Sequence, residues 1–311
     1  MLRMINYFIS TDGKMRQIES YQEDCWLQVV APSEKEITAL IEQFDLEPDY
    51  IRASLDEEES SRIESEDGKT LIIIDAPICE NVKDDMIYST VPIGIIVTEK
   101  NVITVTLNEN PIVSGFAQGY VKGVQTNLKT RFVLQLMLKV AMRFLQYLKQ
   151  IDKLSSSLEK QLRKSMKNKE LIELLDIEKS LVYFSTSLKA DESTIEKLGR
   201  GRYLKMYEED RDLHEDVLVE LKQAIEMSNI YLNIMSGTMD AFASVISNNL
   251  NVVMKVLASI TIVISVPNII SSFYGMNVDG LPLKEYFWFP VVLAGVIMLV
   301  LAFILKKKDM M

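Results

Sequence analysis

The chain is poor in the residues that most enzyme and metal sites need. Its 311 residues include one histidine, His214, and two cysteines, Cys25 and Cys79, which form no CxxC pair. This scarcity argues against a zinc centre, a redox centre and Cys/His nucleophilic catalysis. The sequence also has no phosphate-binding glycine loop. We therefore expect no enzyme and no tightly bound cofactor, and we interpret His214 as a solvated helix residue.

Positive charge is scarce as well. The formal net charge is −10, and the one basic cluster is Lys306, Lys307 and Lys308. This balance argues against nucleic acid as a partner. Residues 1–9 lack a basic segment followed by a long apolar run, so we expect no secretory signal peptide.

Two segments near the C-terminus contain no charged residue, at 256–273 and 286–305. About 20 predominantly apolar residues are enough to cross a ~30 Å hydrocarbon core. We predict two membrane spans, at about residues 252–273 and 286–305, in the cell membrane. Because positive residues beside short loops stay on the cytoplasmic side, the lysine cluster after the second span predicts that both chain termini are cytoplasmic.

The hydrophobic period divides the chain into four predicted parts. Residues 1–125 mix strand and helix patterns and predict a cytoplasmic α/β domain. Residues 126–201 have the 3.6-residue period of a helical hairpin, with a turn within 188–201. A very long stalk helix is expected over 202–250, continuing into the first of two transmembrane helices in a pore domain, 251–311. The predicted fold class is an α+β, α-helical membrane protein.

Local signals place several elements in the first domain. Ser33 and Glu36 have the spacing of a helix capping box, and a second helix is expected after Pro48. Alternating or β-branched runs predict strands, with turns between the later ones. The expected strands lie at residues 5–10, 26–31, 71–74, 87–97 and 102–107.

The stalk helix has few residues that could interrupt it. From residue 202 to residue 273 the only glycine is Gly237 and the only proline is Pro267. A helix of this length extends roughly 100 Å at 1.5 Å per residue. Such a helix needs packing partners along its length, and two spans per chain are too few to enclose a polar path. We therefore predict a homo-oligomer.

The first predicted span is polar along one side. Polar residues inside a span usually face the interior of a helix bundle or a water-filled path. Asn251, Ser265, Asn268 and Ser272 fall near one helical face and predict a pore lining. Packing between helices through the hydroxyl groups is the alternative.

The first span ends in Tyr274-Gly275-Met276-Asn277, and the second span follows within a dozen residues. Preceded by Met239-Asp240, Ile246-Ser247-Asn248 and the run 251–257, this motif resembles the pore helix of the CorA family of divalent-cation (magnesium and cobalt) transporters. The resemblance covers the whole chain and is strongest over 236–277. It implies a homopentamer with a cytoplasmic funnel, in which Asn277 from five subunits forms the outer selectivity ring.

The resemblance also implies roles for other residues. Asn251, Met254, Leu257 and Asn268 would line the conduit, with Met254 and Leu257 as a hydrophobic gate. Mg²⁺ would be both the transported and the regulatory ion. Cytoplasmic Mg²⁺ would bind at acidic residues between subunits, and the candidates are Asp216, Asp240, Asp84 and Asp85. A solvated helix face is the alternative for the acidic residues around Asp216.

The chemistry of an Asn277 ring fits a hydrated ion. Mg²⁺ gives up its waters reluctantly, and amide oxygens accept hydrogen bonds from a hydration shell without stripping it. Gly275 is expected to adopt a backbone conformation that other residues avoid. The alternative is that Gly-Met-Asn is a helix C-cap, with Gly or Asn in the left-handed conformation.

The loop after the motif departs from the family pattern at one position. Many family members have Met-Pro-Glu-Leu after the motif, whereas Leu283 occupies the Glu position here, with Asp279 and Glu285 keeping negative charge nearby. The departure leaves the cation preference open.

Two other functions are alternatives to magnesium transport. A zinc transporter of the ZntB type, including a proton-coupled one, is the first rival. A membrane-anchored scaffold that conducts no ion is the second.

Overall fold

The computed structural model describes residues 5–11, 13–82, 85–165, 168–278, 280–283, 285–308 and 310. The chain forms two compact units, Met1–Ser236 and Gly237–Met311. Two residues named above, Asp84 and Asp279, lie outside the described residues.

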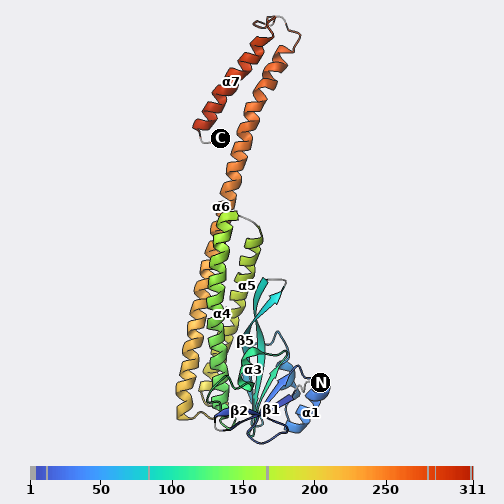
Figure 1. Ribbon diagram of the computed structural model, residues 1–311, viewed down its shortest axis with the longest axis vertical. Helices are drawn as coiled ribbons and strands as arrows, with labels where there is room; N and C mark the ends of the chain where they lie inside the picture. The colour runs from blue at the N-terminus through green and yellow to red at the C-terminus, as the bar shows by residue number, and fades with distance from the viewer. Residues whose placement is uncertain are drawn as a thin grey trace. The chain divides into compact units, whose positions relative to one another are not determined.

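A mixed sheet is the centre of the first unit (Figure 1). Seven strands are found among the described residues, in the order β2-β1-β3-β7-β6-β5-β4. The β3–β7 pair is parallel and the neighbouring pairs are antiparallel. The strand bounds are β1 (Ile5–Thr11), β2 (Lys14–Ile18), β3 (Trp26–Val30), β4 (Arg62–Glu66), β5 (Lys69–Val82), β6 (Asp85–Val97) and β7 (Val102–Thr106).

The five predicted strands are present, whereas β2 and β4 were not predicted. Both are edge strands of five residues, and most of their side chains are at least partly exposed. A strand that buries little apolar surface has no hydrophobic alternation to reveal it, so only its pairing with a neighbour defines it.

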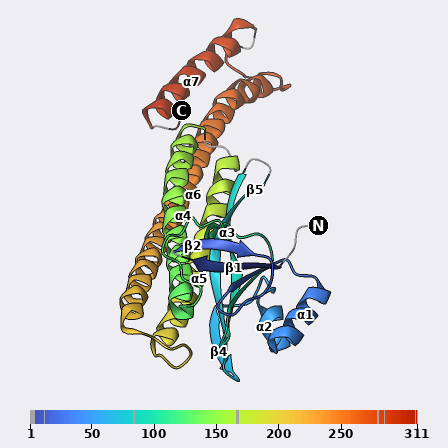
Figure 2. The ribbon, with the colours of Figure 1, turned by 60° about the horizontal axis from the view of Figure 1, so that its bottom comes forward.

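Helices cover both faces of the sheet (Figure 2). Side chains alternate between faces along a strand. Leu27 and Val29 of β3 therefore belong to the core under α1 and α2, whereas Trp26 points to the other face. There its ring lies 6.5 Å from that of Phe116 and 5.2 Å from that of Phe132. The helices of this unit are α1 (Glu34–Phe44), α2 (Pro48–Ala53), α3 (Pro111–Ala117), α4 (Lys129–Ser165), α5 (Asn168–Gly199) and the first part of α6 (Glu208–Tyr274).

The capping box at the start of α1 is confirmed. The Ser33 backbone N–H donates to Glu36 Oε2 at 2.9 Å, and the Ser33 hydroxyl donates to the same oxygen at 2.7 Å. These hydrogen bonds lower the pKa of the Glu36 carboxyl, because they stabilise its ionised form. The helix predicted after Pro48 is also confirmed, as α2.

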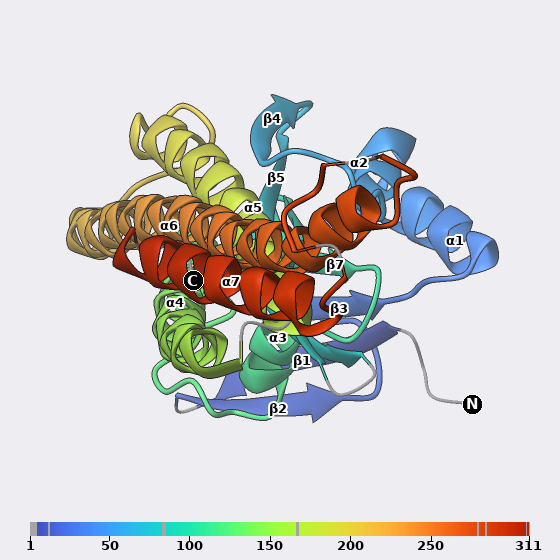
Figure 3. The same ribbon diagram turned by 90° about the horizontal axis from the view of Figure 1, so that it is seen from above.

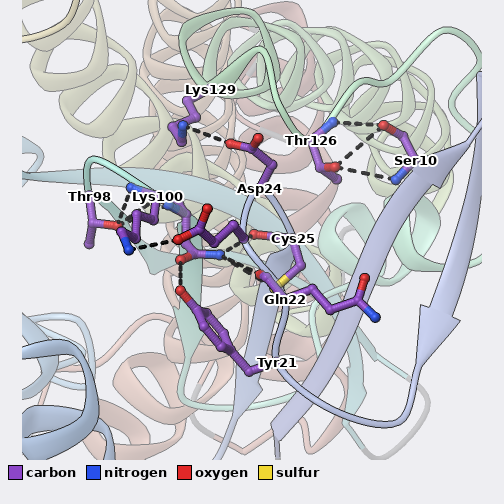
Figure 4. Close-up of polar contacts among 11 residues, drawn as sticks. Ser10, Tyr21, Gln22, Asp24, Cys25, Thr98, Lys100, Thr126 and Lys129 are labelled. Carbon is purple, nitrogen blue, oxygen red and sulfur yellow. Dashed lines mark hydrogen bonds and ion pairs between the residues drawn. The ribbon is translucent and has the colours of Figure 1, made fainter.

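The start of β3 is held by a polar network that includes a cysteine (Figure 4). The Asn101 amide donates to Cys25 O at 3.0 Å and to Gln22 O at 3.2 Å, while Tyr21 donates its hydroxyl proton to Asn101 Oδ1 at 2.8 Å. Cys25 is fully buried, and this burial raises the pKa of its thiol. Cys25 is therefore a packed core residue rather than a reactive one.

The turn predicted within 188–201 begins at the end of this segment, at Arg200 and Gly201, where Gly201 has a φ of 68°. Helix α5 continues to Gly199, because Leu188, Ile195 and Leu198 extend its buried stripe. The chain turns after α5, and α6 begins at Glu208 rather than near residue 202.

The first part of α6 packs against α5 through polar and apolar contacts. His214 Nε2 lies 2.9 Å from Ile195 O, and Ser228 donates to Leu181 O at 3.2 Å. His214 is half-buried beside Gly199, where any larger residue would collide with its ring. The interpretation of His214 as a solvated residue is therefore wrong. The pattern on its own helix could not reveal the facing glycine on α5.

The second unit consists of the last part of α6 and of α7 (Trp288–Lys307), which returns beside it (Figures 1 and 3). The Tyr274 and Phe289 rings lie 6.2 Å apart at one end of this pair. At the other end, the fully buried Ser259 hydroxyl lies 2.7 Å from Met310 O. These two contacts tie the last part of α6 to the start of α7 and to the segment just after its end.

Candidate ion-conducting segment and acidic residues

The two helices of the second unit are long and apolar enough to span a membrane. Only 11% of the apolar window of α6 and 6% of that of α7 are buried in the chain. A core helix of a soluble protein would bury most of this surface against its own chain. The apolar surface of these helices is therefore available to lipid or to other subunits.

The six predicted pore-lining residues lie on one side of α6. At 3.6 residues per turn their positions fall within an arc of about 120°. The buried Ser259 and Val266, which mark the side nearer α7, fall outside this arc. Of these six residues, Ser265 is half-buried. The other five are exposed: Asn251, Met254, Leu257, Asn268 and Ser272. The second unit therefore leaves this side of α6 uncovered.

Hydroxyl and amide side chains on α6 differ in their hydrogen bonding. Thr261 donates to Leu257 O at 2.8 Å, and Ser265 donates to Thr261 O at 2.7 Å, each one turn back along the helix. Asn251 and Asn268 have no hydrogen-bond partner among the described residues. The hydroxyl groups are thus compatible both with a pore lining and with packing between helices. The amide groups of Asn251 and Asn268 still need hydrogen-bond partners.

The Tyr274-Gly275-Met276-Asn277 motif forms the end of α6. Gly275 N–H donates to Ser271 O at 2.9 Å, and Met276 N–H donates to Phe273 O at 3.3 Å. Neither Gly275 nor Asn277 has a positive φ. The expectation of a special backbone conformation at Gly275 is therefore wrong, and so is the left-handed C-cap alternative. A Cβ at Gly275 would lie 3.2 Å from Ser271 O, so glycine matters here for space.

The loop after the motif is anchored to α6. The Tyr274 hydroxyl donates to Pro282 O at 3.1 Å, and the positive φ of this loop occurs at Gly280 and Leu283. Asn277 is exposed and has no hydrogen-bond partner among the described residues. Leu283, at the position where many family members have Glu, is also exposed. The anchored loop thus leaves the Asn277 amide accessible.

The four acidic candidates do not form a site within the part of the chain that the structure describes. Asp216 and Asp240 are exposed on α6, in different compact units. Asp85 is the first residue of β6, and Asp84 is not among the described residues. Over the described ranges, no three His, Cys, Asp or Glu side chains come together to hold a metal.

Comparison with known proteins identifies the family. A family model described as CorA-like Mg²⁺ transporter protein matches residues 21–307. The chain belongs to this family. It is 27% identical over 293 residues to the cobalt/magnesium transport protein CorA of Methanocaldococcus jannaschii, covering 91% of this chain and 90% of the relative.

Solved structures support the same fold. The complete structure of the CorA magnesium transporter from Methanocaldococcus jannaschii superposes with a TM-score of 0.83 at 22% identity, covering 99% of this chain and 98% of that one. The cytoplasmic domain of ZntB from Vibrio parahaemolyticus matches with a TM-score of 0.60 at 14% identity, covering 79% of this chain and 97% of that one. The predicted fold class is confirmed: a mixed-sheet N-terminal domain, a long helix and two apolar C-terminal helices.

Proposed function

We propose that the chain assembles into a homopentameric CorA-type channel in the cell membrane, with cytoplasmic termini, that passes hydrated Mg²⁺. Co²⁺ is the second ion we propose, since the full-length relative is named a cobalt/magnesium transport protein. Membership of a transporter family supports the proposal. The apolar surface that the second unit leaves uncovered supports a membrane location.

Asn268 is the observation that carries the proposal. It lies inside an apolar helical segment, is exposed and has no partner among the described residues. An unsatisfied polar group in the hydrocarbon core costs several kcal/mol. The amide must therefore face water or other subunits. If this side of α6 faces the centre of an oligomer, Asn268 and Asn251 line a polar path. The remaining apolar surface of the second unit then contacts lipid.

The proposed path ends in amides at its outer mouth. In the pentamer, Asn277 at the end of α6 forms a ring of neutral oxygens, and these accept hydrogen bonds from the waters around Mg²⁺. A neutral ring binds the ion weakly enough to release it, as conduction requires. Met254 and Leu257 form the hydrophobic constriction. Ser265 lies between Asn251 and Asn268, and Ser272 lies between Asn268 and the mouth.

Regulation by cytoplasmic Mg²⁺ is the second part of the proposal. The exposed carboxylates Asp216 and Asp240, with Asp84 or Asp85 from the α/β domain, repel their neighbours across subunit contacts. A bound Mg²⁺ removes this repulsion and holds the stalk helices together. Loss of the ion then loosens the stalks and opens the gate.

Cysteine accessibility tests the orientation of α6. Cys25 is buried, so a Cys79→Ser background suffices. In liposomes, Asn268→Cys is expected to react with a membrane-impermeant, water-soluble thiol reagent. Leu299→Cys, exposed on α7, is the matched control and is expected to face lipid and stay unreacted. An unreactive residue 268 beside a reactive residue 299 would contradict the proposed path.

A further inference from the structure

Two aspartates, the buried Asp191 and the half-buried Asp75, lie between the sheet and the helices of the first unit. Asp75 belongs to β5, and Asp191 belongs to α5. Asp191 is only 3% exposed. Its Oδ1 accepts a hydrogen bond from the Asp75 backbone N–H at 2.9 Å and another from the Ser61 hydroxyl at 2.7 Å. One carboxyl oxygen of Asp191 is thus fixed to the sheet.

The other oxygen, Asp191 Oδ2, has no hydrogen-bond partner among the described residues. Asp191 lines a small cavity of about 10 Å³, which is room for no more than about one water molecule. A hydrated metal ion is therefore too large for this site, whereas a proton is not. The other residues of the cavity wall are apolar and come from four elements: Ile74 of β5, Met137 and Val140 of α4, Ile195 of α5 and Leu221 of α6.

Asp75 is the charged group that acts on Asp191. Burial raises the pKa of the Asp191 carboxyl well above its ordinary range, and the charge of Asp75 raises it further. Burial also raises the pKa of Asp75. Two apolar side chains of α4 and Leu221 of α6 line the cavity. The titratable His214 of α6 instead contacts Ile195 O, four residues beyond Asp191 on α5.

When both carboxyl groups are ionised, the buried Asp191 Oδ2 is left without a hydrogen-bond donor among the described residues. Ser61 interacts with both Asp191 and Asp75 but has one proton to donate. Ser187 interacts with Asp75 and lies 3.0 Å from the Thr90 hydroxyl. A proton on one carboxyl makes that group a donor and removes the repulsion between the two. The network therefore has room for one additional proton.

We propose that the buried Asp191, together with Asp75, forms a proton-binding site that controls how tightly α6 packs against α5 and the sheet. With the proton bound, the cavity beside Leu221 holds a neutral acid and stays closed. When the proton leaves for solvent, the charge of Asp191 remains in an apolar cavity, close to the charge of the partly exposed Asp75. Water must then enter to solvate them, and the contact that Leu221 makes from α6 loosens.

The sign of the pH effect follows from linkage. The folded chain holds this proton more tightly than the unfolded chain, in which the pKa of an aspartate is about 3.9. The contribution of the pair to stability is therefore complete below about pH 4 and is lost as pH rises through the raised pKa of the folded state. The first unit is expected to become less stable, and α6 more loosely packed, toward alkaline pH.

Infrared spectroscopy of the full-length protein in detergent tests the site directly. A protonated carboxylic acid has a carbonyl stretch that an ionised carboxylate lacks. In the wild type we expect this band to persist to a higher pH than the ~3.9 of an ordinary aspartate, and we expect its loss in Asp191→Asn. The control is Glu196→Gln, an exposed acid on the same helix, which is expected to leave the band unchanged. A wild-type spectrum without the band, or a band that survives in Asp191→Asn, would overturn the proposal.

Two further measurements keep the test decisive if Asp191→Asn folds poorly. In Asp75→Asn the repulsion is gone, so the remaining acid band is expected to titrate away at lower pH than in the wild type. Hydrogen exchange around Leu221, corrected for its intrinsic pH dependence, is expected to accelerate with pH in the wild type and in Glu196→Gln. An unshifted band midpoint or pH-independent exchange would contradict the site. Neither measurement involves ion flux, so the result is independent of the proposed transport function.

Discussion

The two compact units use apolar residues in opposite ways. In the first unit, Trp26 and Phe132 are almost completely buried within the chain. In the second unit, Trp288 and Phe303 are 72% and 70% exposed. The first unit thus completes its own core, whereas the second leaves most of its apolar surface available to surroundings outside the chain.

Polar groups differ between the units in the same way. The buried amide of Asn101 in the first unit is hydrogen-bonded to neighbouring backbone carbonyls. The amides of Asn251, Asn268 and Asn277 in the second unit have no partner among the described residues. Because polar groups that leave water need partners, the unpaired amides support the proposal that this side of α6 lines a polar path. Four predictions test this difference, beginning with the largest expected effect.

Asn277→Ala is expected to reduce Mg²⁺ flux into liposomes most strongly. Each lost amide contact is worth ~0.5–1.5 kcal/mol, and ~1.4 kcal/mol already corresponds to a factor of ten. With five subunits we expect a loss of selective flux of at least about tenfold. Asn127→Ala, an exposed asparagine in the first unit, is the control and should conduct normally. Unchanged flux at normal expression would remove Asn277 from the selectivity ring.

Phe132→Ala and Phe303→Ala compare the two kinds of aromatic residue directly. Truncation of the buried Phe132 is expected to lower the free energy of unfolding by about 3–5 kcal/mol. Truncation of the exposed Phe303 is expected to change it by no more than about 0.5 kcal/mol. Denaturant titration of the full-length protein in detergent measures both. Equal losses would show that Phe303 is buried in the assembled oligomer and does not face lipid.

Replacing Asp216 and Asp240 together by Ala is expected to weaken inhibition by internal Mg²⁺. Coupling of ~1–3 kcal/mol would shift the inhibitory concentration by about 5- to 150-fold. Asp212→Ala, another exposed acid on α6, is the matched control. The measurement is Mg²⁺ flux at a series of internal Mg²⁺ concentrations. An unaltered inhibition curve would return both residues to an ordinary solvated helix face.

His214→Ala is expected to have the smallest effect. It removes the hydrogen bond to Ile195 O and the contact with Gly199, so the first unit should lose about 0.5–1.5 kcal/mol of stability. Thermal unfolding followed by circular dichroism measures this loss, and basal Mg²⁺ flux should remain. A His214→Ala protein with unchanged stability but no flux would give His214 a role in transport instead.

The long helices could be predicted from the sequence because their signals are local. The absence of proline and glycine over most of 202–273 predicts α6, and its end at Tyr274 lies one residue from the predicted limit. The lack of charge in 286–305 similarly predicts α7. These features depend on composition and spacing along one element, and no knowledge of neighbouring elements is needed.

Contacts between distant elements could not be predicted in this way. No pattern on α6 indicates that the His214 ring meets a glycine of α5. Nothing in the sequence pairs Asp191 with Asp75, which lies 116 residues earlier. The backbone conformation at Gly275 was mispredicted. Glycine can be needed at a helix end because a side chain would not fit there, and not only because the residue has a positive φ. The roles of the acidic residues and of the pore-lining residues are still predictions, since they concern several subunits.

Ion flux into liposomes that contain the purified full-length protein tests the central claim most directly. The measurement uses Mg²⁺- and Zn²⁺-sensitive dyes, with and without a pH gradient. We predict Mg²⁺ entry that is driven by membrane potential, is blocked by internal Mg²⁺ and needs no pH gradient. Zn²⁺ entry that depends on the proton gradient would instead support a ZntB-type transporter. The absence of any flux would contradict the proposed channel and favour a non-conducting membrane scaffold.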